Sequence, residues 1–135
     1  MLTPFLYKEI DMIQAYSNNI TVAANQAIPF NNVSLLKGCT ATQNGASTFA
    51  LNKCGVYEVC VSVSASASET IQLYKNGVAA PEATSTGTTP NFVTLVQVDH
   101  DNNPCCACSS PVTIQVISTT EATLTDASIV ITKLR

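Results

Sequence analysis

The residues best suited to chemistry lie in one short stretch, where three cysteines follow the only histidine of the chain. Cys105 and Cys108 have the Cys-x-x-Cys spacing that many zinc sites use, and His100 offers an imidazole nitrogen as a third ligand. A second pair with this spacing is absent. A zinc site built on His100, Cys105 and Cys108 would therefore need further ligands, which other copies of the chain could supply.

The six cysteines leave two other interpretations open. They stand at positions 39, 54, 60, 105, 106 and 108, and an even number is compatible with disulfides. Cys39 or Cys54 could then bond to one cysteine of the 105–108 cluster after the protein leaves the cell. Alternatively, all six are reduced and pack as small apolar side chains, as free cysteines commonly do.

The acidic residues around His100 offer oxygen ligands for calcium. Asp99-His-Asp-Asn-Asn103 slightly resembles a calcium-binding loop, but it lacks the glycine and the downstream acidic ligand of the EF-hand pattern. A solvated turn is the simpler interpretation. No cofactor is therefore expected, with zinc or calcium as the minor alternatives.

The sequence does not favour an enzyme. His100 is the sole histidine, so every Ser–His or Cys–His mechanism would have to use it. The chain has no Gly-x-Ser-x-Gly segment and no glycine-rich phosphate loop. We therefore expect a binding or structural protein without catalytic residues.

The composition excludes further classes of function. The 135 residues carry a net charge of −3, and the six basic residues are scattered. Nucleic-acid wrapping and a polybasic membrane anchor are both unsupported by this pattern. Only 11% of the residues are charged, against about 25% in ordinary globular proteins. Burial of part of the surface between subunits would explain this shortage.

A clear β pattern begins at Gly55. Tyr57, Val59, Val61 and Val63 alternate with polar or small residues, which predicts a strand over 55–67 with one buried face. Its other face has small side chains and includes Cys60, Ser62 and Ser64. Small side chains permit the close approach of another subunit, although a solvent-exposed serine face has the same sequence pattern.

Further strands are predicted on both sides of this one. They cover 19–24, 27–30, 33–37, 47–51, 71–75, 92–98, 111–117 and 127–135, while 119–123 is expected to turn. Residues 79–90 are expected to form a weak strand and an exposed loop, and residues 99–111 a loop. These two loops are expected to make contacts at the far end of the domain. The strand Phe92–Val98 is apolar on both sides, which indicates a central or an interfacial position.

The first 17 residues have a different pattern from the rest. Their apolar residues recur at spacings of three and four, which predicts either a short helix or an extended arm that docks on a neighbour. We therefore divide the chain into an attachment segment, 1–17, and a domain, 18–135. The candidate attachment residues are Leu2, Phe5, Leu6, Ile10 and Ile13.

The motifs in these strands resemble the tumour-necrosis-factor/C1q-like jelly-roll family, in particular its bacterial and bacteriophage members. They are Gly-Val-Tyr-Glu-Val at 55–59, Ile-Gln-Leu-Tyr-Lys-Asn-Gly at 71–77, Pro-Val-Thr-Ile-Gln-Val at 111–116 and Ala-Ser-Ile-Val-Ile-Thr-Lys-Leu at 127–134. Asn-Gln-Ala-Ile-Pro-Phe-Asn at 25–31 is also similar to that branch. The resemblance covers about residues 18–135.

The resemblance implies an all-β, ten-strand, two-sheet jelly roll that forms a homotrimer with both termini near one end. Together with the small face of strand 55–67 and the apolar strand 92–98, it gives a set of candidate trimer-interface residues. These are Cys60, Ser62, Ser64, Phe92 and Leu95.

Within this family, the sequence favours a structural display protein on a bacteriophage virion: a capsid decoration, a head fibre or a tail-fibre accessory. Residues 1–17 would attach it to the capsid or fibre protein, and its far end would contact the host surface. No signal peptide and no membrane-spanning run is found, so we expect synthesis in the bacterial cytoplasm and a final place on the virion surface. The alternatives are a soluble carbohydrate- or host-surface-binding module and a spore-surface glycoprotein domain.

Overall fold

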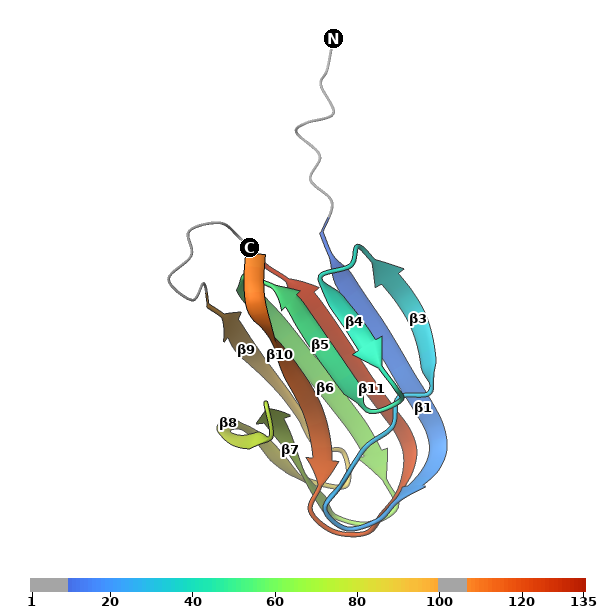
Figure 1. Ribbon diagram of the computed structural model, residues 1–135. Coiled ribbons are helices and arrows are strands. Elements are labelled where there is room, and N and C mark those ends of the chain that lie inside the picture. The colour runs from blue at the N-terminus through green and yellow to red at the C-terminus, as the bar shows by residue number, and fades with distance from the viewer. Residues whose placement is uncertain (1–9, 100–106) are drawn as a thin grey trace.

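Two antiparallel β-sheets pack face to face in the computed structural model, which describes residues 10–99 and 107–135 (Figure 1). These residues contain strands and turns but no helix, and therefore none that could span a membrane. The strands are β1 (Met12–Val22), β2 (Gln26–Ala27), β3 (Asn32–Lys37), β4 (Ala41–Asn44), β5 (Thr48–Lys53), β6 (Gly55–Ala65), β7 (Glu69–Lys75), β8 (Val78–Gly87), β9 (Asn91–Val98), β10 (Ala107–Ser118) and β11 (Ala122–Lys133).

The strand order is that of a jelly roll. Sheet A has the order β3-β1-β11-β6-β9, and sheet B has the order β4-β5-β10-β7-β8, with the two-residue β2 paired to β10. Neighbours in each sheet often lie far apart in the sequence, as β1 and β11 do. The prediction of an all-β fold with two sheets is confirmed, and the expected ten strands become eleven when β2 is counted.

The hydrophobic core fills the space between the two sheets. Tyr57 of β6 is fully buried there, and its hydroxyl donates a hydrogen bond of 2.7 Å to the carbonyl oxygen of Lys53. Phe30 and Phe49 contact each other with ring centroids 5.8 Å apart. The other large side chains without solvent exposure are Ile13, Ile28, Leu51, Ile71, Leu73, Ile114, Leu124, Ile129 and Ile131.

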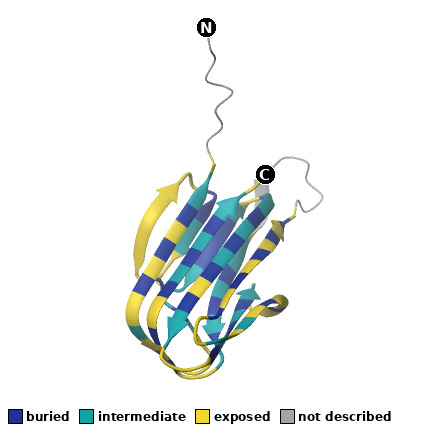
Figure 2. Cartoon of the chain, turned by 180° about the vertical axis from the view of Figure 1, so that it is seen from behind, coloured by how far each residue is buried: buried dark blue, intermediate teal, exposed yellow. Residues whose placement is uncertain are grey.

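Strand β6 confirms the alternation read from the sequence. Its residues from Tyr57 to Val63 alternate between the core and the outside of sheet A. The alternation ends where the pairing with β11 shifts register beside Leu124 and Asp126. Figure 2, which shows sheet A from outside, displays this alternation as stripes of buried and less buried residues along the strands.

The described part of the N-terminal segment is extended, so the predicted helix is wrong there. Residues 12–17 belong to β1, which pairs with β11 on one side and β3 on the other. Ile13 is 1% exposed and packs in the core, so it is not free to attach to another protein. Ile10 is exposed, while Leu2, Phe5 and Leu6 lie outside the described residues.

The weak strand predicted within residues 79–90 is present as β8, and it covers most of the segment that was also expected to be an exposed loop. Strand β8 pairs with β7, but its register shifts between Gln72 and Tyr74. The side-chain amide of Gln72 fills the bulge and donates to the carbonyl oxygens of Ala80 and Ala83, the latter at 3.1 Å. Both alanines are buried although they stand three positions apart, because both lie within the bulge. The alternation with a period of two is therefore not visible in the sequence of this strand.

Strand β9 is the outer strand of sheet A, so the central alternative for Phe92–Val98 is wrong. Phe92 points into the core opposite Val61, while Val93 and Leu95 point outward. An outer strand with apolar residues on its outward side is compatible with the interfacial alternative.

Both ends of the described chain lie at the same end of the sandwich (Figure 1). The amide of Lys133 donates to the carbonyl oxygen of Asp11, and the amide of Val56 donates to that of Arg135. Gly55, next to Val56, pairs with Val98, so Asp99 also lies at this end. The predicted loop 99–111 therefore begins beside the termini and not at the far end, and its last residues, 107–111, belong to β10.

Candidate functional site

The outward face of sheet A is the most unusual surface of the molecule. Many of its side chains lie in three rows that run across four or five of its strands. The rows are Tyr16, Ser128, Ser62 and Asn91; Leu35, Gln14, Val130, Cys60 and Val93; and Lys37, Met12, Thr132, Glu58 and Leu95. We call these residues the sheet A face.

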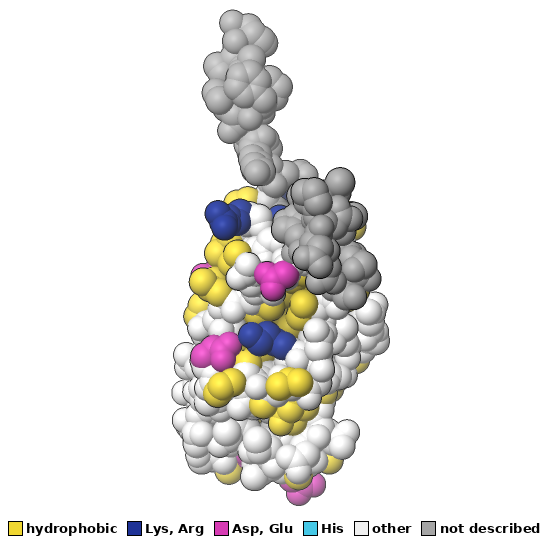
Figure 3. Space-filling model, turned by 60° about the vertical axis from the view of Figure 1, so that its left-hand side comes forward, with side chains coloured by type: hydrophobic (Ala, Val, Ile, Leu, Met, Phe, Trp, Pro, Cys, Tyr) yellow, Lys and Arg dark blue, Asp and Glu magenta, His cyan; other side chains and the backbone are white. Residues whose placement is uncertain are grey.

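The sheet A face exposes large apolar side chains around a centre of small ones. Val93 is 64% exposed and Leu95 is 56% exposed, and Tyr16 and Leu35 are also exposed. Figure 3, which looks at the side of the sandwich, shows hydrophobic side chains in separate patches with basic and acidic side chains between them. Exposed apolar patches of this kind commonly mark surfaces that bind other proteins.

A shallow depression of about 340 Å³ lies over β11, β6 and β9 on the sheet A face. Its floor is made by small side chains of β6 and β11, namely Cys60, Ser62 and Ser128, and its rim includes Val93. Burial of the thiol, together with the negative charge of Glu58 beside it, raises the pKa of Cys60 above its ordinary value. The protonated thiol is a poor nucleophile, so the depression suits packing better than chemistry.

The outward face of sheet B is polar, in contrast to the sheet A face. Gln115 donates a hydrogen bond of 2.9 Å to the hydroxyl of Thr48, and Thr113 bonds to the side chain of Asn76. Lys75 and Glu82 form an ion pair of 3.3 Å at the β7–β8 hairpin. This sheet can therefore face water on its outer side, whereas the sheet A face is better suited to burial.

Not all of the candidate interface residues point to the same side of sheet A. Cys60, Ser62, Ser64 and Leu95 all point outward from sheet A, whereas Phe92 points into the core. Most other residues of the face were not predicted as interface residues from the sequence, among them the apolar Tyr16, Leu35, Val93 and Val130. The alternation of β9 could have separated Val93 from Phe92, because neighbours in a strand point to opposite sides.

The cysteines do not form one group. Cys54 is disulfide-bonded, so the interpretation that all six cysteines are reduced is wrong, whereas Cys39 and Cys60 are free. The described side chains contain no group of three or more potential metal ligands. His100 and Cys105 lie outside the described residues, as does the side chain of Cys108, so the zinc interpretation stays a prediction.

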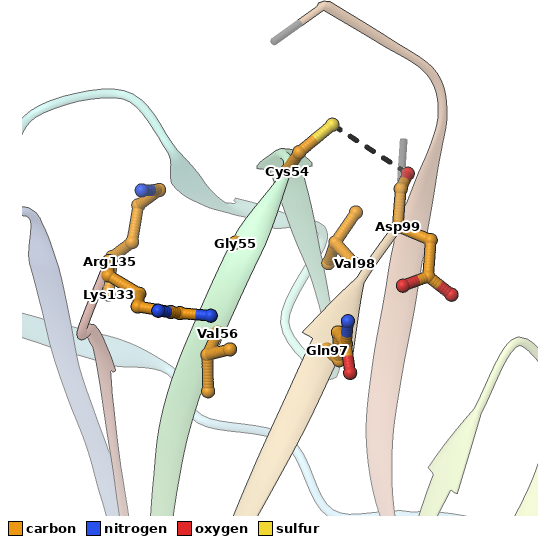
Figure 4. Close-up of a pocket in the computed structure, with 8 residues that line it drawn as sticks. All are labelled: Cys54, Gly55, Val56, Gln97, Val98, Asp99, Lys133 and Arg135. Atoms are coloured by element: carbon orange, nitrogen blue, oxygen red, sulfur yellow. Dashed lines mark hydrogen bonds between the residues drawn. The ribbon is translucent and has the colours of Figure 1, made fainter. Parts of the chain in front are cut away.

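A second concavity, of about 400 Å³, lies at the end of the sandwich that holds both termini (Figure 4). Strand β6 contributes Gly55 and Val56, and the C-terminal segment contributes Lys133 and Arg135. The sulfur of Cys54 lies 3.6 Å from the carbonyl oxygen of Asp99 at its border. The C-terminal segment is fixed here because the amide of Leu134 donates to Val56 and Arg135 accepts from the same residue.

Gly55 is required by this close approach of two backbones. Its φ is +147°, and a Cβ at this position would collide with the carbonyl oxygen of Arg135. Gly55→Ala is therefore expected to lower the free energy of unfolding by about 2 kcal/mol or more. Gly45→Ala is the matched control, since Gly45 also has a positive φ but has open space around it.

The two glycine variants are compared by urea unfolding at equal protein concentration. Strain from φ alone predicts a loss of about 1 kcal/mol for Gly45→Ala. An equal loss in both variants would contradict the proposed fixing of the C-terminal segment.

Comparison with known proteins supports the fold assignment. No family model matches the chain, and no curated protein sequence matches it. Among solved structures, vertex protein P5 of phage PRD1 is similar over 93% of this chain and 97% of its own, with a TM-score of 0.64 and 12% identity. Eiger TNF from S. frugiperda gives a TM-score of 0.70 at 11% identity, over 95% and 94% of the two chains. The globular domain of zebrafish complement 1qA gives 0.68 at 9% identity, over 93% and 97%.

The two sheets and their strand order define a two-sheet jelly roll. The similar structures identify it further as a TNF/C1q-like jelly roll, as the sequence motifs predicted. Proteins with this fold typically form trimers and are generally not enzymes.

Proposed function

We propose that the protein is a homotrimeric, non-enzymatic display protein on the surface of a bacteriophage virion. The observation that carries this proposal is the contrast between the two outward faces: sheet B is polar, and the sheet A face exposes apolar side chains around a shallow depression. Burial of three sheet A faces against one another around an axis would remove this surface from water. The similarity to a phage vertex protein favours the virion over other locations.

A trimer axis that runs along the strands suits attachment to a particle. Asp11 and Arg135 lie at the same end of the sandwich, so three copies would direct their N-terminal segments toward the same side. Ile10 is exposed at this end, while Ile13 is buried in the core. Attachment is therefore assigned to residues before β1, that is to residues 1–11 and not to 1–17.

The opposite end of the sandwich would then face the surroundings of the particle. It consists of the turns at residues 23–25, 66–68, 88–90 and 119–121, which are held together by backbone hydrogen bonds such as the one from Ser66 to Thr123. Serine and threonine dominate these turns, and Glu121 is their one charged residue. Contact with the host surface is proposed at this end, and not at the 79–90 and 99–111 loops.

Deletion of residues 1–9 tests the proposal. We expect the shortened protein to remain a folded trimer, because β1 begins at Met12, and to lose at least about nine-tenths of its incorporation into particles. The measurement combines sedimentation velocity on the purified protein with quantification of the protein on gradient-purified particles from its native source. Normal incorporation of the shortened protein would contradict attachment through this segment, and a full-length protein absent from particles would contradict the virion role.

A further inference from the structure

Lys37 and Glu58 are the two charged residues in the three rows of the sheet A face, and Asp126, which also points outward from sheet A, lies beyond these rows beside Ser64. Glu58 of β6 and Lys37 of β3 lie in the same cross-strand row, which runs Lys37, Met12, Thr132 and Glu58. Both side chains point outward. Their partners in this row stand next to buried residues in their own strands, and neighbours in a strand point to opposite sides of the sheet. The face thus carries one negative charge near its β9 side and one positive charge at its β3 side.

These two charges cannot meet within one subunit. Three strand spacings separate β3 from β6, which is about 14 Å at roughly 4.8 Å per spacing. Within residues 10–99 and 107–135, the one ion pair is Lys75–Glu82. The side chain of Glu58 contacts the thiol of Cys60 at 3.8 Å, and no cation from the described part of the chain pairs with its charge.

A ring of three subunits would bring the two sides of the face together. In a closed ring the contact is head-to-tail, so the β9 side of one subunit packs against the β3 side of the next. Rotation about an axis along the strands keeps every residue at the same height. Residues of one cross-strand row therefore meet residues of that same row in the neighbouring subunit.

We propose that Glu58 of each subunit forms an ion pair with Lys37 of the next subunit, and that three such pairs fix the rotational order and the vertical register of the trimer. This inference rests on the trimer proposed above. The pair would lie beside apolar contacts, with Leu95 and Val93 of one subunit against Met12 and Leu35 of the next. Exclusion of water by these apolar neighbours would strengthen the pair.

Charge reversal tests the pair in the full-length protein. Glu58→Lys and Lys37→Glu each place like charges together at three contacts, so each is expected to raise the Kd of the trimer by about 100-fold or more. The double variant restores opposite charges, and its Kd is expected to return to within about tenfold of the wild type. Lys75→Glu, which breaks the ion pair on sheet B, is the control and should leave the Kd of the trimer unchanged.

Sedimentation velocity over a range of concentrations gives each Kd, and circular dichroism checks that each variant is folded. Single variants with the wild-type Kd, or a double variant no tighter than the weaker single variant, would overturn the pair while the trimer stands. A wild-type protein that remains a monomer would overturn the trimer itself and the pair with it.

Salt dependence gives a second readout that does not rely on the reversed variants folding. Raising NaCl from 0.05 to 0.5 M, a range of about tenfold chosen to shorten the Debye length, is expected to weaken the wild-type trimer. The neutral pair Glu58→Gln with Lys37→Met should lose most of that dependence. An equal salt dependence in both proteins would overturn the pair.

Discussion

Glutamate in place of Leu95 is expected to convert the trimer into folded monomers, with a rise of about 1,000-fold or more in the Kd of the trimer. Leu95 is 56% exposed on β9 in the single subunit and lies in the sheet A face beside Glu58. A glutamate there would place an unpaired carboxylate in each of three contacts. Burial of an unpaired charge costs several kcal/mol, which exceeds what a typical contact residue contributes to association.

Leu36→Glu is the matched control for this prediction. Leu36 is 55% exposed, so its environment in the single subunit is nearly the same, but it lies on the side of β3 that points away from the sheet A face, opposite Ile13. We expect this variant to remain a trimer by sedimentation velocity. Alkylation of Cys60 gives a further readout, since its thiol lies on the sheet A face and should react only in the monomer.

Two results would contradict the interface. One is a trimeric Leu95→Glu variant with protected Cys60. The other is an equal loss of association in Leu95→Glu and Leu36→Glu, which would indicate a general effect of added charge. Circular dichroism of the Leu95→Glu monomer should match the wild type, because Leu95 does not contribute to the core.

The sequence predicted correctly those strands in which alternating apolar and polar residues match the buried and exposed sides of the paired strand. Strand β6 is the clearest case, since it has paired strands on both sides and Val59, Val61 and Val63 all face the core. A strand in that position must bury one face completely. Its alternation is therefore strict, and the same alternation correctly predicted that Cys60 and Ser62 point outward.

Strand β1 shows why the N-terminal segment was harder to predict. Within residues 12–17 the buried residues are Ile13, Ala15 and Ser17, and a buried serine does not mark a core position in the sequence. The Ser17 hydroxyl is buried because it donates to the carbonyl oxygen of Pro29 and accepts from the amide of Asn31. The large residues that remained, Ile10, Ile13 and Tyr16, have helical spacing although they lie on different sides of an extended chain.

The start of β11, at the far end of the sandwich, was also predicted wrongly, because it depends on pairing with a strand distant in the sequence. Strand β11 begins at Ala122, within the predicted turn 119–123, because its first residues pair with the end of β1. The rows of the sheet A face could not be predicted either. They depend on the register of β3 against β1 and of β9 against β6, which sequence patterns do not specify.

Alanine in place of Ile13 is expected to lower the free energy of unfolding of the subunit by about 3 kcal/mol, whereas alanine in place of Tyr16 should leave it nearly unchanged. Ile13 packs between the two sheets opposite Ile131, and the removal of a buried isoleucine side chain costs about 2–5 kcal/mol. Tyr16 stands three residues later on the same strand but points out of the sheet A face. Its loss should instead weaken the trimer.

Unfolding of a trimer depends on protein concentration, so the two variants are best compared in the monomeric Leu95→Glu background. Urea unfolding then reports the stability of the subunit alone, and sedimentation of the same variants without Leu95→Glu reports their association. A small stability loss for Ile13→Ala would show that residues 12–17 are peripheral, as an attachment arm requires. A large loss would make β1 part of the folded domain and would restrict the attachment segment to the residues that precede it.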